Sequence, residues 1–215
     1  MYATLIFVHT SMKGDEMRAI IFDHGGVLSL GGGKGTNERV ASHAMGFEKI
    51  IKVPSELVRA LKLGWINNSQ YVKEVNRLYP NAPMKLTDKM WDRVYDLLKP
   101  ELLSYEFARH CRMSGKIVGL FSNISSGMAA RLRADGSYND FDLIALSCDM
   151  HCAKPNAAAY AAVEALLPNI PPAEILLLDD QVACVEGAKM RGWQAMKVTS
   201  PEQMIRDACR RYNLF

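Results

Sequence analysis

The stretch from Met17 to Leu28, MRAIIFDHGGVL, constrains the fold of this chain more than any other. Ala19 to Phe22 form a continuous apolar run, which is typical of a strand buried on both faces of a parallel sheet. The run stops at Asp23, and the glycines at 25 and 26 allow a tight turn that brings the backbone close to a ligand. An Asp in this position can also cap a loop or a helix. In open α/β sheets, however, ligands bind at the carboxyl ends of the strands.

Two further apolar runs end in the same way. Residues 116–121, KIVGLF, stop at Ser122-Asn123, and residues 175–178, ILLL, stop at Asp179-Asp180. Because the carboxyl ends of neighbouring parallel strands lie along one edge of a sheet, we expect these polar side chains to lie close together. The alternation of strands with helical segments predicts an α/β fold, a doubly wound parallel sheet with right-handed crossovers.

The segment after the first strand has a different character. Residues 36–112 contain no strand suited to a sheet core, and their apolar residues recur at helical spacing. Start signals at Pro54, Asn68, Thr87 and Pro100 predict four helices, over residues 54–63, 68–79, 87–99 and 100–113. We therefore expect a helical insertion at 31–112, within a core domain of 17–30 and 113–215. Residues 1–16 are expected to be an extension, and the glycine-rich residues 30–35 a flexible hinge.

In the second half of the chain the expected elements alternate regularly. Strands are predicted over 141–146 and 193–198, and helices over 125–134, 155–167 and 182–191 and from Pro201 onward. Pro155 suits the first turn of its helix.

The three aspartates predict a metal site. Asp23, Asp179 and Asp180 at adjacent strand ends would repel one another by about 1 to 4 kcal/mol for each pair at 4 Å. A cation would relieve this repulsion, and carboxylate oxygens with one open face suit Mg2+. A helix N-cap needs only one of the two consecutive aspartates, so the second indicates a metal. Cys148, His151 and Cys152 lack the paired spacing of a structural zinc site.

Four motifs in order give the chain a resemblance to the haloacid dehalogenase (HAD) superfamily. They are Asp23 in FDHGGV, Ser122 in FSN, Lys154 in AKPN and Asp179-Asp180 in LLLDD. The phrases LSCDMHCAKPNAAAY and DDQVACVEGAKMRGW resemble capped subfamily I, which includes glucose-1-phosphatase-like enzymes, the phosphatase domain of soluble epoxide hydrolases and 2-haloacid dehalogenases. The resemblance covers most of the chain from Met17 onward, and it implies a Rossmann-like core domain. It also implies that the helical insertion at 31–112 is a small helical cap subdomain that closes over the site.

The resemblance also implies roles for individual residues. It points to a Mg2+-dependent phosphatase of a small phosphorylated metabolite, such as a sugar phosphate, with Asp23 as the nucleophile that forms an aspartyl-phosphate. Ser122 and Lys154 would stabilise the transferred phosphoryl group. The implied metal ligands are Asp23, the carbonyl of Gly25, Asp180 and, more through water, Asp179. The implied substrate-binding residues are His24, Gly26 and Asn123. Cap contacts could come from His43, Arg59, Trp65 and Tyr71.

One position departs from the family pattern. Related phosphatases usually carry an Asp two residues after the nucleophile, as general acid and base, but this chain has Gly25. Loss of a proton donor costs a factor of about 10² to 10⁴ where the leaving group needs protonation. The substrate could then have a good leaving group, another group such as His24 could move the proton, or the chain could be a binding or regulatory protein. A 2-haloacid dehalogenase is a further alternative, although Asp179-Asp180 would hinder an anionic haloacid.

Composition and charge bear on nucleic-acid binding, on the redox compartment and on membrane or secretory segments. The net charge of +3 is small and spread along the chain, unlike the basic stripe of a nucleic-acid binder. Five cysteines without framework spacing predict a reducing cytoplasm. Leu5 to Val8, the only apolar run ahead of the first motif, is too short for a membrane span or a secretory signal. We expect a small phosphorylated molecule as the partner, and a monomer or homodimer.

Overall fold

The structure is a computed structural model, and it describes residues 16–30, 35–212 and 214. Nearly all of the predicted extension, and residues 31–34 of the predicted hinge, lie outside the described residues. The division into extension, core and cap stays a prediction.

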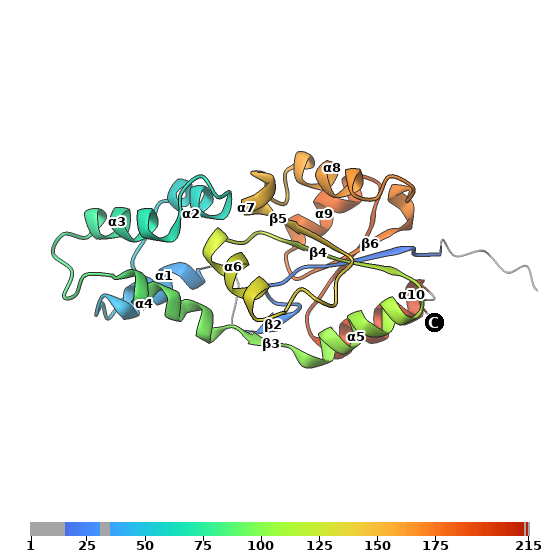
Figure 1. The fold of residues 1–215 in the computed structure, drawn as a ribbon, viewed down its shortest axis with the longest axis horizontal. Helices are drawn as coiled ribbons and strands as arrows, with labels where there is room; N and C mark the ends of the chain where they lie inside the picture. The colour runs from blue at the N-terminus through green and yellow to red at the C-terminus, as the bar shows by residue number, and fades with distance from the viewer. Residues whose placement is uncertain (1–15, 31–34, 213, 215) are drawn as a thin grey trace, which may run out of the picture.

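A parallel sheet forms the centre of the molecule (Figure 1). It has five strands in the order β5-β4-β1-β6-β7. These strands are β1 (Ala19–Phe22), β4 (Ile117–Ser122), β5 (Leu143–Leu146), β6 (Ile175–Asp179) and β7 (Gln194–Lys197). The last residue of β1, Phe22, lies beside Leu120 of β4 and Leu178 of β6. The predicted α/β fold with a parallel, doubly wound sheet is confirmed.

Helices cover both faces of this sheet (Figure 1). The helices α5 (Leu102–Met113) and α10 (Pro201–Tyr212) pack on one face, and α8 (Ala157–Ala165) and α9 (Val182–Met190) pack on the other. Alternate residues of β1 point to opposite faces of the sheet. Ile20 and Phe22 belong to the hydrophobic cluster with α5 and α10, and Ile21 belongs to the hydrophobic cluster with α8 and α9. All four residues of β1 are fully buried, as its apolar run predicts.

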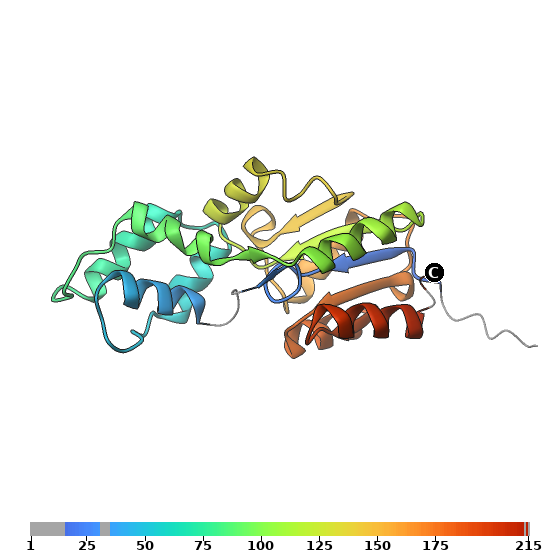
Figure 2. The same cartoon turned by 90° about the horizontal axis from the view of Figure 1, so that it is seen from below.

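A second group of helices lies beyond the carboxyl ends of the strands (Figures 1 and 2). It consists of α1 (Thr36–Ala44), α2 (Ser55–Lys62), α3 (Asn68–Leu78), α4 (Asp88–Asp92) and the 3-10 helix η1 (Arg93–Leu97). Their own apolar centre includes Tyr71 stacked on Trp91, with ring centroids 4.7 Å apart. An antiparallel ribbon of β2 (Ser29–Leu30) and β3 (Lys99–Pro100) joins this group to the sheet. We call these helices the cap helices.

Three smaller elements complete the chain. They are α6 (Ser126–Ala134), α7 (Ser147–Met150) and the 3-10 helix η2 (Pro172–Glu174). Both α6 and α7 begin close to the carboxyl end of a strand, β4 and β5 respectively, and both therefore lie near the cap helices.

Some expected boundaries are wrong. The helix expected at 87–99 is two elements, α4 and η1. Pro100 opens no helix, because it pairs with Ser29 in the ribbon and α5 starts two residues later. The helix expected from Pro155 starts at Ala157, because the Asn156 side chain accepts a hydrogen bond from Ala158 N at 2.9 Å and caps it there. Most of α5 falls within the segment predicted as the cap, and in the structure this helix packs against β4 and α10.

Candidate active site

Asp23 follows directly from the central strand. Its backbone N–H donates to the carbonyl of Leu178 at 2.9 Å, so the ladder between β1 and β6 continues to the carboxylate. The chain then turns sharply, since the His24 carbonyl accepts hydrogen bonds from the backbone N–H groups of Leu28 and Ser29, each at 2.9 Å. Strands on both sides end at the same level, so the sheet edge collects polar residues from three segments.

The three predicted aspartates meet at this edge. Asp23, Asp179 and Asp180 each offer a carboxylate oxygen within 4.8 Å of the others, and this is the one such group of three potential metal ligands in the described parts of the chain. Burial raises the pKa of Asp180, and the neighbouring charges of Asp23 and Asp179 raise it further. Burial likewise raises the pKa of Asp179. Crowded carboxylates of this kind favour a bound cation.

The surroundings of Asp180 show whether the site suits such a cation. Its Oδ1 atom is buried without a hydrogen-bond partner among the described residues. Buried carboxylate oxygens are costly to leave unpaired, so this atom suits direct coordination of a metal. Gly26 leaves room for the carboxylate, since a Cβ at that position would lie 2.8 Å from Asp180 Oδ2. The donor set consists of hard oxygen atoms, which fits Mg2+.

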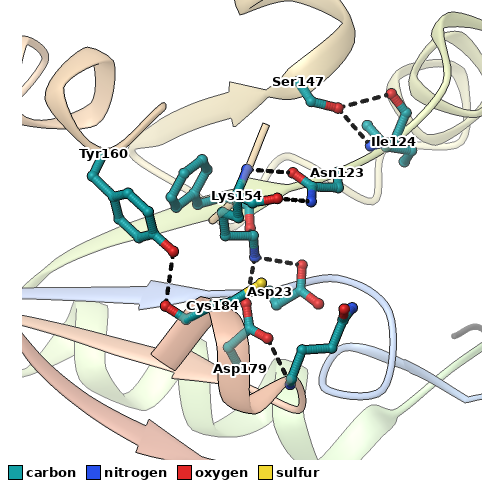
Figure 3. Close-up of polar contacts among 10 residues, drawn as sticks. Asp23, Asn123, Ile124, Ser147, Lys154, Tyr160, Asp179 and Cys184 are labelled. Carbon is teal, nitrogen blue, oxygen red and sulfur yellow. Dashed lines mark hydrogen bonds and ion pairs between the residues drawn. The ribbon is translucent and has the colours of Figure 1, made fainter. Parts of the chain in front are cut away.

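Lys154 ties two of the aspartates together (Figure 3). Its Nζ donates to Asp23 Oδ1 at 2.9 Å, to Asp179 Oδ2 at 2.6 Å and to the carbonyl of Phe121 at 2.6 Å. Burial acts to lower the pKa of this ammonium, but Asp23 and Asp179 together raise it well above its ordinary value. Lys154 is therefore a fixed positive charge beside Asp23.

Asn123 positions Lys154. The Asn123 side chain donates to the Lys154 carbonyl at 2.8 Å and accepts from the Lys154 N–H at 2.9 Å (Figure 3). A paired amide of this kind fixes the main chain of the loop, because both groups of one residue are held by one side chain. This geometry favours a positioning role for Asn123 over the substrate contact expected for it.

A cavity of about 110 Å³ lies at the same edge, between the sheet and the cap helices. From the sheet side it is lined by His24, Gly25, Ser122, Asn123, Ile124, Ser125 and Met128, and from the cap side by Thr36, Asn37, Lys62, Tyr95 and Leu98. A Cβ at Gly25 would meet no atom within 4 Å. The position that carries an Asp in related phosphatases is therefore open space in this chain.

His24 is a neutral part of the wall. It is 4% exposed, and burial lowers the pKa of its imidazole to about 4, against a smaller opposing effect of Asp135. At neutral pH the ring thus carries no extra proton, and a general acid must carry one. The geometry favours His24 as a packing residue beside the site rather than as a replacement proton donor.

The expected cap contacts lie elsewhere. Tyr71 is buried against Trp91, Arg59 lies 6.0 Å from the ring centroid of Trp65, and His43 lines a separate groove of about 600 Å³ between α1 and α4. None of the four expected residues is among the described residues that line the cavity beside Gly25. Sequence reasoning missed Lys62, which resembles any basic residue in the last turn of a helix.

Direct contacts join the cap helices to the sheet side. The Ser147 hydroxyl donates to the Lys62 carbonyl at 2.6 Å, and His151 Nδ1 contacts the Leu63 carbonyl at 2.8 Å. Asn68 donates to the Tyr95 hydroxyl at 2.8 Å, and that hydroxyl lies 3.3 Å from Ser125 Oγ. These contacts place the cap helices over the cavity.

No helix in the described parts of the chain has the length and apolar character needed to cross a membrane. No protein-family model and no curated protein matches the sequence.

Solved structures do resemble this one. A predicted HAD-like family hydrolase from Porphyromonas gingivalis is 22% identical, with a TM-score of 0.74 over 90% of this chain and 97% of its own. A HAD family enzyme from Bacteroides thetaiotaomicron, in complex with magnesium and inorganic phosphate, is 18% identical, with a TM-score of 0.70 over 84% and 93%.

The L-2-haloacid dehalogenase from Xanthobacter autotrophicus, with chloropropionic acid covalently bound, is also similar. It is 19% identical, with a TM-score of 0.57 over 90% of this chain and 83% of its own. The resemblance read from the four motifs is thus confirmed at the level of the fold: the chain has the Rossmann-like α/β fold of the HAD-family enzymes.

Proposed function

We propose that this protein is a Mg2+-dependent phosphatase of a small phosphorylated metabolite, acting through an aspartyl-phosphate on Asp23. The observation that carries this proposal is the buried contact of Lys154 with Asp23 and Asp179, next to the unpartnered Oδ1 of Asp180. A nucleophilic carboxylate, a fixed cation and an oxygen-rich metal site are the parts that phosphoryl transfer needs. The similar Bacteroides enzyme, solved with magnesium and phosphate, supports this choice.

The chain's own residues supply most of the chemistry. A carboxylate oxygen of Asp23 attacks phosphorus, the bond to the leaving oxygen breaks, and water then hydrolyses the acyl phosphate. Lys154 holds the Asp23 carboxylate and stabilises negative charge on the phosphoryl oxygens, and Ser122 offers a hydroxyl from the cavity wall. Asp23, Asp180, the Gly25 carbonyl and, through water, Asp179 would hold Mg2+, which when bound supplies further positive charge.

The residues beside Asp23 that line the cavity favour a leaving group of a particular type. Gly25 has no side chain to give a proton, and His24 is neutral at pH 7. A leaving group that needs no protonation, as in a sugar 1-phosphate or an acyl phosphate, suits this site best.

A substrate panel tests the proposal. Phosphate release from α-glucose 1-phosphate, acetyl phosphate and p-nitrophenyl phosphate is measured with and without Mg2+, for the parent, for Asp23→Asn and for the surface control Asp207→Asn. We expect Mg2+-dependent release that falls by about 10³-fold or more only in Asp23→Asn. Release by Asp23→Asn at the parent rate would contradict the proposal.

Two alternatives have their own readouts. The likeness to the Xanthobacter dehalogenase motivates a haloacid assay, in which halide release that survives EDTA would identify a dehalogenase. The missing side chain at Gly25 motivates the second, a binding or regulatory protein, which would retain phosphate or Mg2+ without turnover. A cytoplasmic location and a monomeric or homodimeric state stay predictions.

A further inference from the structure

We propose that Lys62 binds a second anionic group of the substrate, so that the preferred substrates are phosphorylated small molecules carrying a carboxylate or another phosphate. This inference rests on the proposed phosphatase function, and it names the substrate class of the same cavity.

The main chain of Lys62 is fixed at the boundary between cap and sheet. Its carbonyl accepts the Ser147 hydroxyl at 2.6 Å, and the next carbonyl, of Leu63, is held by His151. Gly64 packs so closely that a Cβ there would lie 2.4 Å from the carbonyl oxygen of Cys148. The end of α2 is thus held against α7, and Lys62 is held at the cavity. A side chain whose main chain is fixed in this way starts from a defined position, so binding has to order less of the chain than it would on a loose loop.

Among the described residues, the charge of Lys62 is not paired with a carboxylate. Among the described residues that line the cavity, Lys62 is the only lysine, and none of them is an arginine, an aspartate or a glutamate. No salt bridge joins Lys62 to a carboxylate in the described parts of the chain. Lys154 and one bound divalent cation would balance the three aspartates of the sheet edge, so the ammonium of Lys62 would be available for a ligand.

The location of Lys62 indicates which part of the ligand it meets. The transferred phosphoryl group must reach Asp23, where Lys154 and the acidic pair already provide its electrostatic partners. Lys62 enters from the cap side of the cavity, together with Asn37 and Tyr95. We therefore place its partner on the leaving group rather than on the transferred phosphate. A cation held in a cavity discriminates charged from neutral ligands through a charge-assisted hydrogen bond.

Ligand binding tests this without relying on turnover. Calorimetry in the presence of Mg2+, in an Asp23→Asn background that prevents hydrolysis, compares phosphoglycolate with ethyl phosphate, and glucose 1,6-bisphosphate with glucose 1-phosphate. The first pair reports on a carboxylate and the second on another phosphate. The variants are Lys62→Met, Lys62→Arg as the conservative change, and Lys73→Met as a matched loss of charge on the exposed side of α3.

We expect at least one ligand with a second anionic group to bind about tenfold or more tightly than its partner without that group. Lys62→Met should reduce that preference to about twofold, whereas Lys62→Arg and Lys73→Met should retain it. Equal binding of both members of each pair, or no binding of any of the four, would overturn the inference. So would a Lys62→Met variant that weakens inorganic phosphate as much as it weakens the acidic ligands, because Lys62 would then serve the transferred group.

Turnover of the parent enzyme separates the two proposals. A preference that depends on Lys62, in a protein that hydrolyses none of the panel, would support the inference and contradict the phosphatase. Hydrolysis with no such preference would do the reverse.

Discussion

The carboxylate cluster at the sheet edge and the cap side of the cavity are built differently, and we call them the sheet wall and the cap wall. In the sheet wall, Lys154 contacts Asp23 and Asp179, and Asp180 lies within the same cluster. In the cap wall, Lys62 is the one cation among the described residues that line the cavity. A substitution in a cluster of buried, mutually paired charges should lower both the free energy of unfolding and the activity, because it leaves a buried charge without its partner. A substitution of a cation without a charged partner should alter ligand recognition alone.

The largest effect should come from Lys154→Met. This change leaves the carboxylates of Asp23 and Asp179 buried without their cation, which typically costs about 3 to 5 kcal/mol of the free energy of unfolding. Urea denaturation without Mg2+ measures the loss, and added Mg2+ should restore part of it, because a divalent cation can balance the same carboxylates.

The control for this change is Lys189→Met. Lys189 forms an exposed ion pair with Glu186 on α9, and such pairs contribute about 0 to 1 kcal/mol. Lys62→Met should resemble this control in stability. If Lys154→Met unfolded at the same urea concentration as both, the two walls would not differ in the way described.

Gly25→Asp should add an activity. The Cβ position of Gly25 is open, so an Asp fits there and can give a proton to the leaving group. We expect hydrolysis of a poor leaving group, as in glucose 6-phosphate, to rise by about 10- to 100-fold, and that of acetyl phosphate to stay unchanged. The matched control is Gly25→Asn, which has the same size and no acidic proton. An equal rise in Gly25→Asn would show that the side chain acts by packing.

Gly26→Ala should have a smaller effect, on metal binding and stability. Gly26 has a φ of +80°, which an alanine rarely adopts, and the new Cβ would lie 2.8 Å from Asp180 Cγ. We expect a loss of about 1 to 2 kcal/mol of the free energy of unfolding and weaker Mg2+ binding by calorimetry. Gly25→Ala, at the open neighbouring position, should change neither by a comparable amount.

The sheet wall was predictable because its polar residues directly follow, in the sequence, the apolar runs that form the strands. A strand buried on both faces is a continuous apolar run, and the polar residue that ends the run is the next letter of the sequence, as at Phe22-Asp23. Parallel pairing then brings the ends of β1, β4 and β6 together without further specification. These three runs therefore predicted the three central strands of the sheet, and two of them predicted the carboxylate cluster.

The cap wall was not predictable, because distant contacts create it. Lys62 is held by Ser147 and its neighbour Leu63 by His151, which are 85 and 88 residues away in the sequence. The four expected cap residues were selected by type alone, and tertiary packing places them away from the cavity. Asn123 shows the same limit, since its partner is a main chain 31 residues away.

The smallest effect concerns a charge away from both walls. Glu164 of α8 accepts a hydrogen bond from Trp193 Nε1 at 2.8 Å and forms an ion pair with Arg191. Burial would raise the pKa of this carboxyl, but the hydrogen bonds from Arg191 and Trp193 together lower it below its ordinary value of 4.5. Because the folded-state pKa is the lower one, its stabilising contribution is present above the unfolded-state pKa and is lost as the pH falls through the folded-state value.

Glu164→Gln should therefore lower the free energy of unfolding by up to about 1 kcal/mol at pH 7. The difference from the parent should shrink towards zero as the pH falls through the folded-state pKa of Glu164, which lies below 4.5, since both proteins then carry an uncharged group at this position. Urea denaturation at a series of pH values, followed by tryptophan fluorescence, measures it. A difference that grew on acidification would contradict the sign. With the expected sign, the largest and smallest effects follow one physical rule: the free-energy cost of losing a charged partner is greater where protein groups have replaced more of the water around the charge.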